Sequence, residues 1–108
     1  MLQSSEIESR FSSIQQAIGQ AAKTLQSESG TPSELKDCIQ RLDRESSKAQ
    51  QVIQSHDESR IIQCVDELES IGDEAKRVCR SQAAVTPRVA EAITKVHDEL
   101  SDLKHKLH

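Results

Sequence analysis

The chain has 108 residues, 30% of them charged and 34% hydrophobic, and Phe11 is its single aromatic residue. This length suits one domain, 1–108, with a core built from Leu, Ile, Val and Ala. The net charge is −4, and because nucleic-acid binding needs a basic face and stacking aromatics, we expect no nucleic-acid partner.

The location expected for this chain follows from two features of its sequence. The first eight residues, Met-Leu-Gln-Ser-Ser-Glu-Ile-Glu, lack the basic region and apolar run of a secretory signal. No apolar run is long enough to span a bilayer, so we expect no membrane partner. We therefore expect a cytoplasmic protein.

The cysteines Cys38, Cys64 and Cys79 are odd in number and form no Cys-x-x-Cys pair. This pattern favours reduced thiols that pack as small apolar residues. It predicts neither a zinc site nor a redox motif. An antiparallel register of the second and third helices about residue 56 also predicts that Cys38 and Cys79 lie too far apart for a disulfide.

Apolar residues recur with helical spacing in four stretches, which predicts helices at about 5–29, 32–54, 57–82 and 87–107. The first and last stretches carry narrow, coiled-coil-like seams with alternating spacings of four and three. These seams are Ile7, Phe11, Ile14, Ile18, Ala21 and Leu25, and Val89, Ile93, Val96, Leu100, Leu103 and Leu107. Similar lengths and short joints predict an all-α, antiparallel up-down-up-down four-helix bundle.

The second and third stretches carry wider apolar faces. Doubled apolar positions occur at Cys38/Ile39, Val52/Ile53, Ile61/Ile62 and Cys64/Val65. Glu45 and Ser46 interrupt the face of the second helix, so we expect thinner packing there. Gly72 lies within the third helix, where a close helix–helix approach would offset its low helix propensity.

Capping signals accompany each helix start. In a capping box, a hydroxyl accepts a hydrogen bond from a free backbone N–H, and a glutamate three residues later accepts one from the backbone N–H of the hydroxyl residue. We predict capping boxes at Ser5 with Glu8, Thr31 with Glu34 and Ser55 with Glu58. Thr86-Pro87 starts the fourth helix, and Gly30 suits the left-handed position that follows the first. Residues 54–58 contain neither Gly nor Pro, so one long helix from 32 to 82 is the alternative to the tight turn that we favour.

The third helix is rich in acids: Asp66, Glu67, Glu69, Asp73 and Glu74. A di-metal carboxylate bundle needs Glu-x-x-His motifs, and the chain has none. We therefore expect these carboxylates to form a solvated face.

The histidines offer few signals of chemistry. His105 and His108 have the spacing of two ligands on one metal, but an exposed helix end is the interpretation that we favour. No glycine-rich phosphate loop or nucleophile–base–acid arrangement is recognisable. We therefore expect no enzyme, no catalytic residue, no cofactor and no metal site.

One face of the first helix is polar but nearly uncharged: Ser9, Ser12, Ser13, Gln16 and Gln20. Uncharged polar surface is easier to desolvate than charged surface, so this is a possible partner face.

The leading hypothesis is a non-enzymatic bundle that binds an unidentified protein partner or self-associates. The alternative is a metal- or cofactor-binding bundle that uses Cys and His with the third-helix carboxylates. A third is a phosphoacceptor or adaptor that uses His56 or His97.

Overall fold

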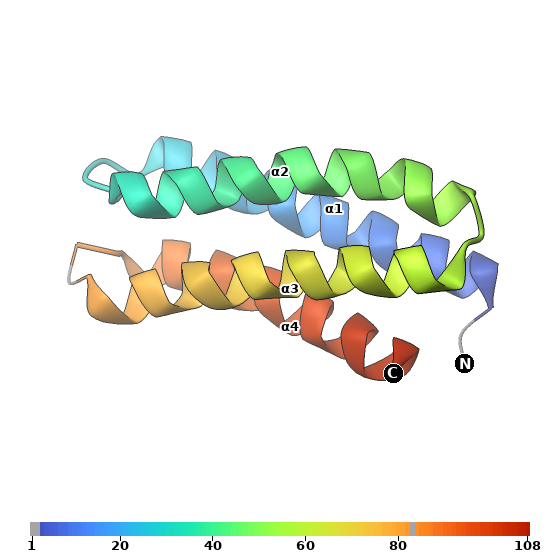
Figure 1. The fold of residues 1–108 in the computed structure, drawn as a ribbon. Helices are drawn as coiled ribbons and strands as arrows, with labels where there is room; N and C mark the ends of the chain where they lie inside the picture. The colour runs from blue at the N-terminus through green and yellow to red at the C-terminus, as the bar shows by residue number, and fades with distance from the viewer. Residues whose placement is uncertain (1–2, 83) are drawn as a thin grey trace.

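The structure is a computed structural model that describes residues 3–82 and 84–108. The described residues form four helices: α1 at Ser4–Ser27, α2 at Ser33–Gln54, α3 at Glu58–Ser81 and α4 at Pro87–Leu107. No strand occurs among the described residues. The molecule measures 41 × 20 × 17 Å, so the helices run along nearly its whole length (Figure 1).

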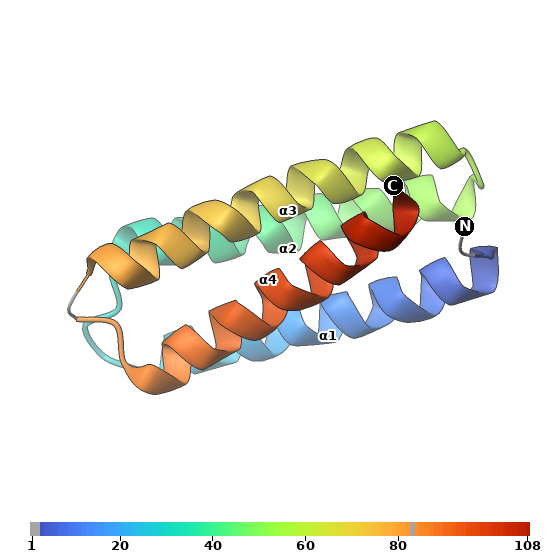
Figure 2. The ribbon, with the colours of Figure 1, turned by 90° about the horizontal axis from the view of Figure 1, so that it is seen from below.

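The four helices form a closed antiparallel ring. α1 packs on α2, α2 on α3, α3 on α4, and α4 back on α1. In Figure 1, α1 and α2 form one layer over α3 and α4, and the two chain ends lie at the same end of the bundle. In Figure 2, which shows the bundle turned by 90°, α2 and α3 form one pair of helices and α4 and α1 form the other. The predicted all-α four-helix bundle is confirmed.

A single apolar core runs along the bundle axis, and every residue of the two narrow seams is buried in it. Bulky aliphatic side chains dominate its centre. The largest fully buried side chains are Ile14, Ile18, Leu35, Leu42, Leu68, Ile93, Leu100, Leu103, Val65, Val89 and Val96. Branched aliphatics thus supply the apolar burial that aromatic residues provide in many other domains.

The wider apolar faces of α2 and α3 are covered. Val52, Ile62 and Cys64 are half-buried and pack against the core. Ser46, which interrupts the face of α2, is itself buried, and its Oγ donates to the backbone carbonyl of Asp43 at 2.9 Å. The hydroxyl is therefore satisfied within its own helix.

The start of α4 matches the sequence prediction. Thr86 Oγ1 accepts a hydrogen bond from the backbone N–H of Val89 at 3.3 Å, and Pro87 is the first helical residue. The fixed φ of proline suits this position, and its missing N–H costs nothing there. The Thr-Pro signal is confirmed.

The capping boxes predicted for α1 and α2 are wrong. α1 begins one residue earlier than expected, with Gln3 at the N-cap and no side-chain cap, so Ser5 already lies inside the first turn. α2 has Pro32 at its N-cap, also without a side-chain cap. Thr31 Oγ1 instead donates to the carbonyl oxygens of Leu25 and Glu28, which the end of α1 leaves free.

The predicted turn between α2 and α3 is present, but its capping residue differs from the prediction. Asp57 is the N-cap of α3, and its Oδ1 accepts from the backbone N–H of Arg60 at 3.3 Å. A carboxylate is favoured there because it also complements the helix dipole. Ser55 serves the preceding helix as the C-cap of α2, where its Oγ donates to the carbonyl of Val52.

Among the described residues of the joints, two have left-handed backbone conformations. Gly30, at φ +80°, follows α1 as expected, although it lies two residues beyond the C-cap Glu28. His56, at φ 59°, is the one non-glycine residue with positive φ in the described part of the chain. A β-carbon is strained in this region, so His56 opposes the turn that it occupies.

We expect the substitution His56→Gly to raise the free energy of unfolding by about 0.5–1 kcal/mol, because glycine adopts this φ without strain. The measurement is the midpoint of urea denaturation. His56→Ala is the matched control: it removes the ring and its contact with Ser4 Oγ at 3.1 Å but keeps the β-carbon. Equal stability of the two variants would contradict the prediction.

Candidate functional site

The partner face predicted on α1 is exposed. Ser9, Ser12, Ser13, Gln16 and Gln20 are all exposed, whereas the seam residues between them are buried. The five side chains therefore share the outer side of one helix. The sequence placed them correctly because helical periodicity alone decides which side faces the core.

Ionisable residues are absent from 11–22 of α1, a span of more than three helical turns. Arg10 borders this span, but its guanidinium is held by Asp102 of α4 at 2.7 Å. Ser13 Oγ donates to Glu99 of α4 at 3.2 Å. The uncharged face is thus bounded along its α4 side by residues that are already paired.

A second cluster lies between α3 and α4. Glu69 and Asp73 are one turn apart on α3, and His97 approaches them from α4. One imidazole nitrogen and one carboxylate oxygen from each acid lie within 4.8 Å of one another. His97 Nε2 and Asp73 Oδ1 are 2.5 Å apart. We call these three residues the α3–α4 cluster.

The members of the α3–α4 cluster differ in exposure and in their other partners. The side chains of Glu69 and His97 are 13% and 15% exposed, whereas that of Asp73 is 51% exposed. Ser101 Oγ donates to Glu69 Oε2 at 3.3 Å, and Lys104 Nζ lies 3.6 Å from Glu69 Oε1. Glu69 is therefore held by two residues of α4, and Asp73 is the most exposed member of the cluster.

The environment of Asp73 favours its charged form. Partial burial raises the pKa of the carboxyl group, but hydrogen bonds with His97 and Glu69 and the nearby charges of His97 and Lys104 lower it by more. The net result is a pKa below the ordinary value for aspartate. Asp73 thus remains a carboxylate, and an available acceptor, into mildly acidic solution.

The acids of α3 are only partly the solvated face that we expected. Glu67 is exposed, but Asp66, Glu69 and Glu74 are half-buried and paired with neighbouring helices. The physical reason is packing on both neighbours of α3: His108 and Lys104 lie opposite Asp66 and Glu69, and Arg41 of α2 lies opposite Glu74. In the sequence, the one-turn spacing of Glu69 and Asp73 indicates that the two acids share a side of α3. It does not identify His97 as their neighbour, because the register between α3 and α4 is not evident from the sequence.

The other histidines lie apart from the α3–α4 cluster. His108 Nε2 lies 2.9 Å from Asp66 Oδ1, and His105 is exposed. The structure therefore gives His108 a carboxylate partner on α3 and does not pair it with His105. His56 lies in the α2–α3 turn.

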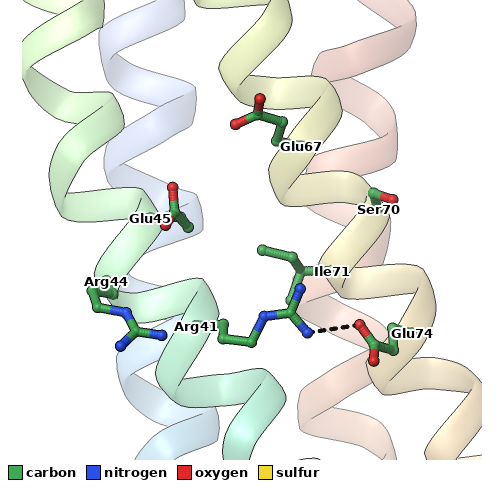
Figure 3. Close-up of a pocket in the computed structure, with 7 residues that line it drawn as sticks. All are labelled: Arg41, Arg44, Glu45, Glu67, Ser70, Ile71 and Glu74. Atoms are coloured by element: carbon green, nitrogen blue, oxygen red, sulfur yellow. Dashed lines mark hydrogen bonds and ion pairs between the residues drawn. The ribbon is translucent and has the colours of Figure 1, made fainter.

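A third site is an open cleft of about 400 Å³ between α2 and α3. Figure 3 shows Arg41 reaching from α2 to Glu74 of α3, where Nη1 and Oε2 are 2.9 Å apart. Arg44, Glu45 and Glu67 also line the cleft. Acids and bases are mixed on its walls, and Arg41 is already neutralised, so the cleft shows no preference for a ligand of one charge.

The three thiols are free, as predicted. Cys38 is buried, and Cys64 and Cys79 are half-buried against the core. Burial is the largest cause that raises the pKa of each thiol, and nearby acids add to the rise at Cys38 and Cys64. For Cys79 the second cause is Cys38 itself. All three are thus disfavoured as thiolates.

We expect Ellman's reagent to modify the folded chain much more slowly than the chain unfolded in guanidinium at the same pH. A raised pKa leaves less thiolate at pH 7.5, and only the thiolate attacks a disulfide reagent. Raising the pH toward 9 should accelerate the reaction. Single Cys→Ser variants would assign the phases, with Cys38 the slowest. Reaction of any thiol at the unfolded rate would contradict the interpretation.

None of the helices in the described part of the chain is both long and apolar enough to cross a membrane. Comparisons with protein-family models, with curated proteins and with solved structures each give no match.

Proposed function

We propose that this protein works without catalysis, by association through the uncharged face of α1, and that the partner at this face is a second copy of the chain. The observation that carries the proposal is the exposed set Ser9, Ser12, Ser13, Gln16 and Gln20, on a helix whose residues 11–22 contain no ionisable group. Elsewhere in the chain charged residues are frequent, at 30% overall.

Electrostatics favours this face over the others for self-association. The chain carries a net charge of −4, so two copies repel one another where acidic surfaces meet. Residues 11–22 of α1 contribute no ionisable group that a partner would have to desolvate. The flanks between helices carry the ion pairs Arg41–Glu74 and Lys104–Glu69, which a docking partner would disturb.

The size and symmetry of the face suit a weak dimer. A surface that meets itself around a two-fold axis uses the same residues on both copies. Small serine side chains and Gly19 let two such helices approach closely. One helix face buries less than the roughly 800 Å² per partner that a stable complex uses, so we expect association to depend strongly on concentration.

Sedimentation equilibrium over about 10 µM to 1 mM tests the proposal, since 1 mM corresponds to about −4 kcal/mol of binding free energy. We expect a reversible monomer–dimer equilibrium for the wild-type chain. Gln16→Glu adds a charge to both copies at the interface and should weaken association by about tenfold or more.

Gln63→Glu is the matched control, because Gln63 is equally polar and exposed but lies on α3. It makes the same change in net charge outside the α1 face, and we expect association close to that of the wild type. Equal effects of the two substitutions would show that net charge alone controls association. A monomer at every concentration would reject self-association.

A further inference from the structure

The α3–α4 cluster combines three groups that ligate metals, from two different helices. Zinc is bound in proteins by imidazole nitrogen and by carboxylate oxygen at about 2.0–2.2 Å. Glu69, Asp73 and His97 supply one such atom each, all within 4.8 Å of one another. A tetrahedral ion with these bond lengths separates its ligands by about 3.3 Å. Metal binding would therefore have to widen the separation of His97 Nε2 and Asp73 Oδ1 from 2.5 Å and bring the more distant ligand atoms closer together.

The backbone brings the two helices close at this level. A β-carbon placed on Gly72 would lie 3.5 Å from Leu100 Cδ1 and 3.8 Å from His97 Cα. A methyl group would just fit at residue 72 and a longer side chain would not, so a small residue here is compatible with the close approach of α3 and α4 beside Asp73. At this interhelical distance the side chains of Asp73 and His97 meet across the groove.

The imidazole of His97 is oriented for ligation. Its Nε2 points at Asp73. Its Nδ1 is buried and forms no hydrogen bond with any of the described residues. Asp98 Oδ1 lies 3.6 Å from Nδ1. A ligating histidine normally donates its other N–H to a carboxylate or carbonyl. Asp98 Oδ1 would have to move closer than 3.6 Å to accept the Nδ1–H when Nε2 binds the metal.

We propose that Glu69, Asp73 and His97 form a binding site for a divalent transition-metal ion of the zinc type, with water completing its coordination. Three protein ligands with water in the fourth position are an arrangement that zinc adopts in proteins. Lys104 opposes binding, because its ammonium lies 3.6 Å from Glu69 Oε1 and competes for that oxygen. Removing the charge of Lys104 is therefore expected to strengthen metal binding.

The test is a competition titration of the untagged, chelator-treated chain with ZnCl2 and a fluorescent zinc chelator. We expect one zinc ion per chain. Asp73→Asn and His97→Gln each remove a ligand and should weaken binding by more than about tenfold. Lys104→Gln removes a positive charge next to the ion and should strengthen binding by about fivefold.

Two controls separate this site from adventitious binding to histidine. His105→Ala removes an exposed imidazole on the same helix, and His108→Ala removes the imidazole paired with Asp66. Both should bind zinc as the wild type does. Circular dichroism of every variant verifies that the bundle is folded, and Co²⁺ absorption provides a second readout of ligand loss. The proposal is overturned if the chain binds no zinc, if binding survives both ligand substitutions, or if it is lost in either control instead.

Discussion

Replacement of Leu100 by alanine is expected to lower the free energy of unfolding by about 3 kcal/mol, within the range of about 2–5 kcal/mol for a buried leucine. Leu100 has 0% of its surface exposed and lies in the middle of α4. Its Cδ1 is 3.5 Å from the position that a β-carbon on Gly72 would take. Helix backbones on all sides restrict collapse around the vacated space, so a cavity should remain.

Urea denaturation followed by circular dichroism measures this loss. Leu107→Ala is the control, since Leu107 is the last residue of α4 and is 5% exposed. The chain end can relax around the smaller side chain, so we expect a loss about half as large or less. An effect at Leu107 equal to that at Leu100 would contradict the central role assigned to Leu100.

Substitutions at Gly72 are expected to change stability in opposite directions. Gly72→Ala should raise the free energy of unfolding by up to about 1 kcal/mol, because alanine has the higher helix propensity. Its β-carbon would make contacts of 3.5–3.8 Å with Leu100 and His97, which are ordinary van der Waals distances. Gly72→Leu adds atoms beyond these contacts and should cost about 1–3 kcal/mol through overpacking.

Gly19 provides the matched pair of controls for Gly72. It also lies within a helix, but a β-carbon there would meet nothing within 4 Å. Both Gly19→Ala and Gly19→Leu should therefore raise stability by up to about 1 kcal/mol. If Gly72→Leu proved as stable as Gly72→Ala, the close approach of α3 and α4 would be refuted. Because that approach also positions His97, Gly72→Leu should weaken zinc binding as well.

The proposed association and the proposed metal site are independent of one another. The first depends on the outer face of α1, and the second on the groove between α3 and α4. Gln16→Glu should leave zinc affinity unchanged, and His97→Gln should leave the monomer–dimer equilibrium unchanged. Each proposal is therefore rejected or supported by its own measurement.

Local signals failed where two neighbouring elements compete for one side chain. Thr31 resembles an N-cap in sequence, but its hydroxyl donates to carbonyls at the end of α1. Ser55 likewise serves the end of α2, and Asp57 caps α3. In a short joint several polar residues lie within reach of both helix ends, and the path of the chain decides which helix each one serves.

The four helices, the buried seams and the uncharged face of α1 could all be predicted from the amino-acid sequence. These properties follow from periodicity along one helix, because residues three and four positions apart share a side whatever the helix packs against. The close approach of α3 and α4 at Gly72, and the contact of Glu69 and Asp73 with His97, could be seen only in the packed bundle. Those contacts join residues 24 or more positions apart. They depend on the register between antiparallel helices, which core packing sets and no local pattern encodes.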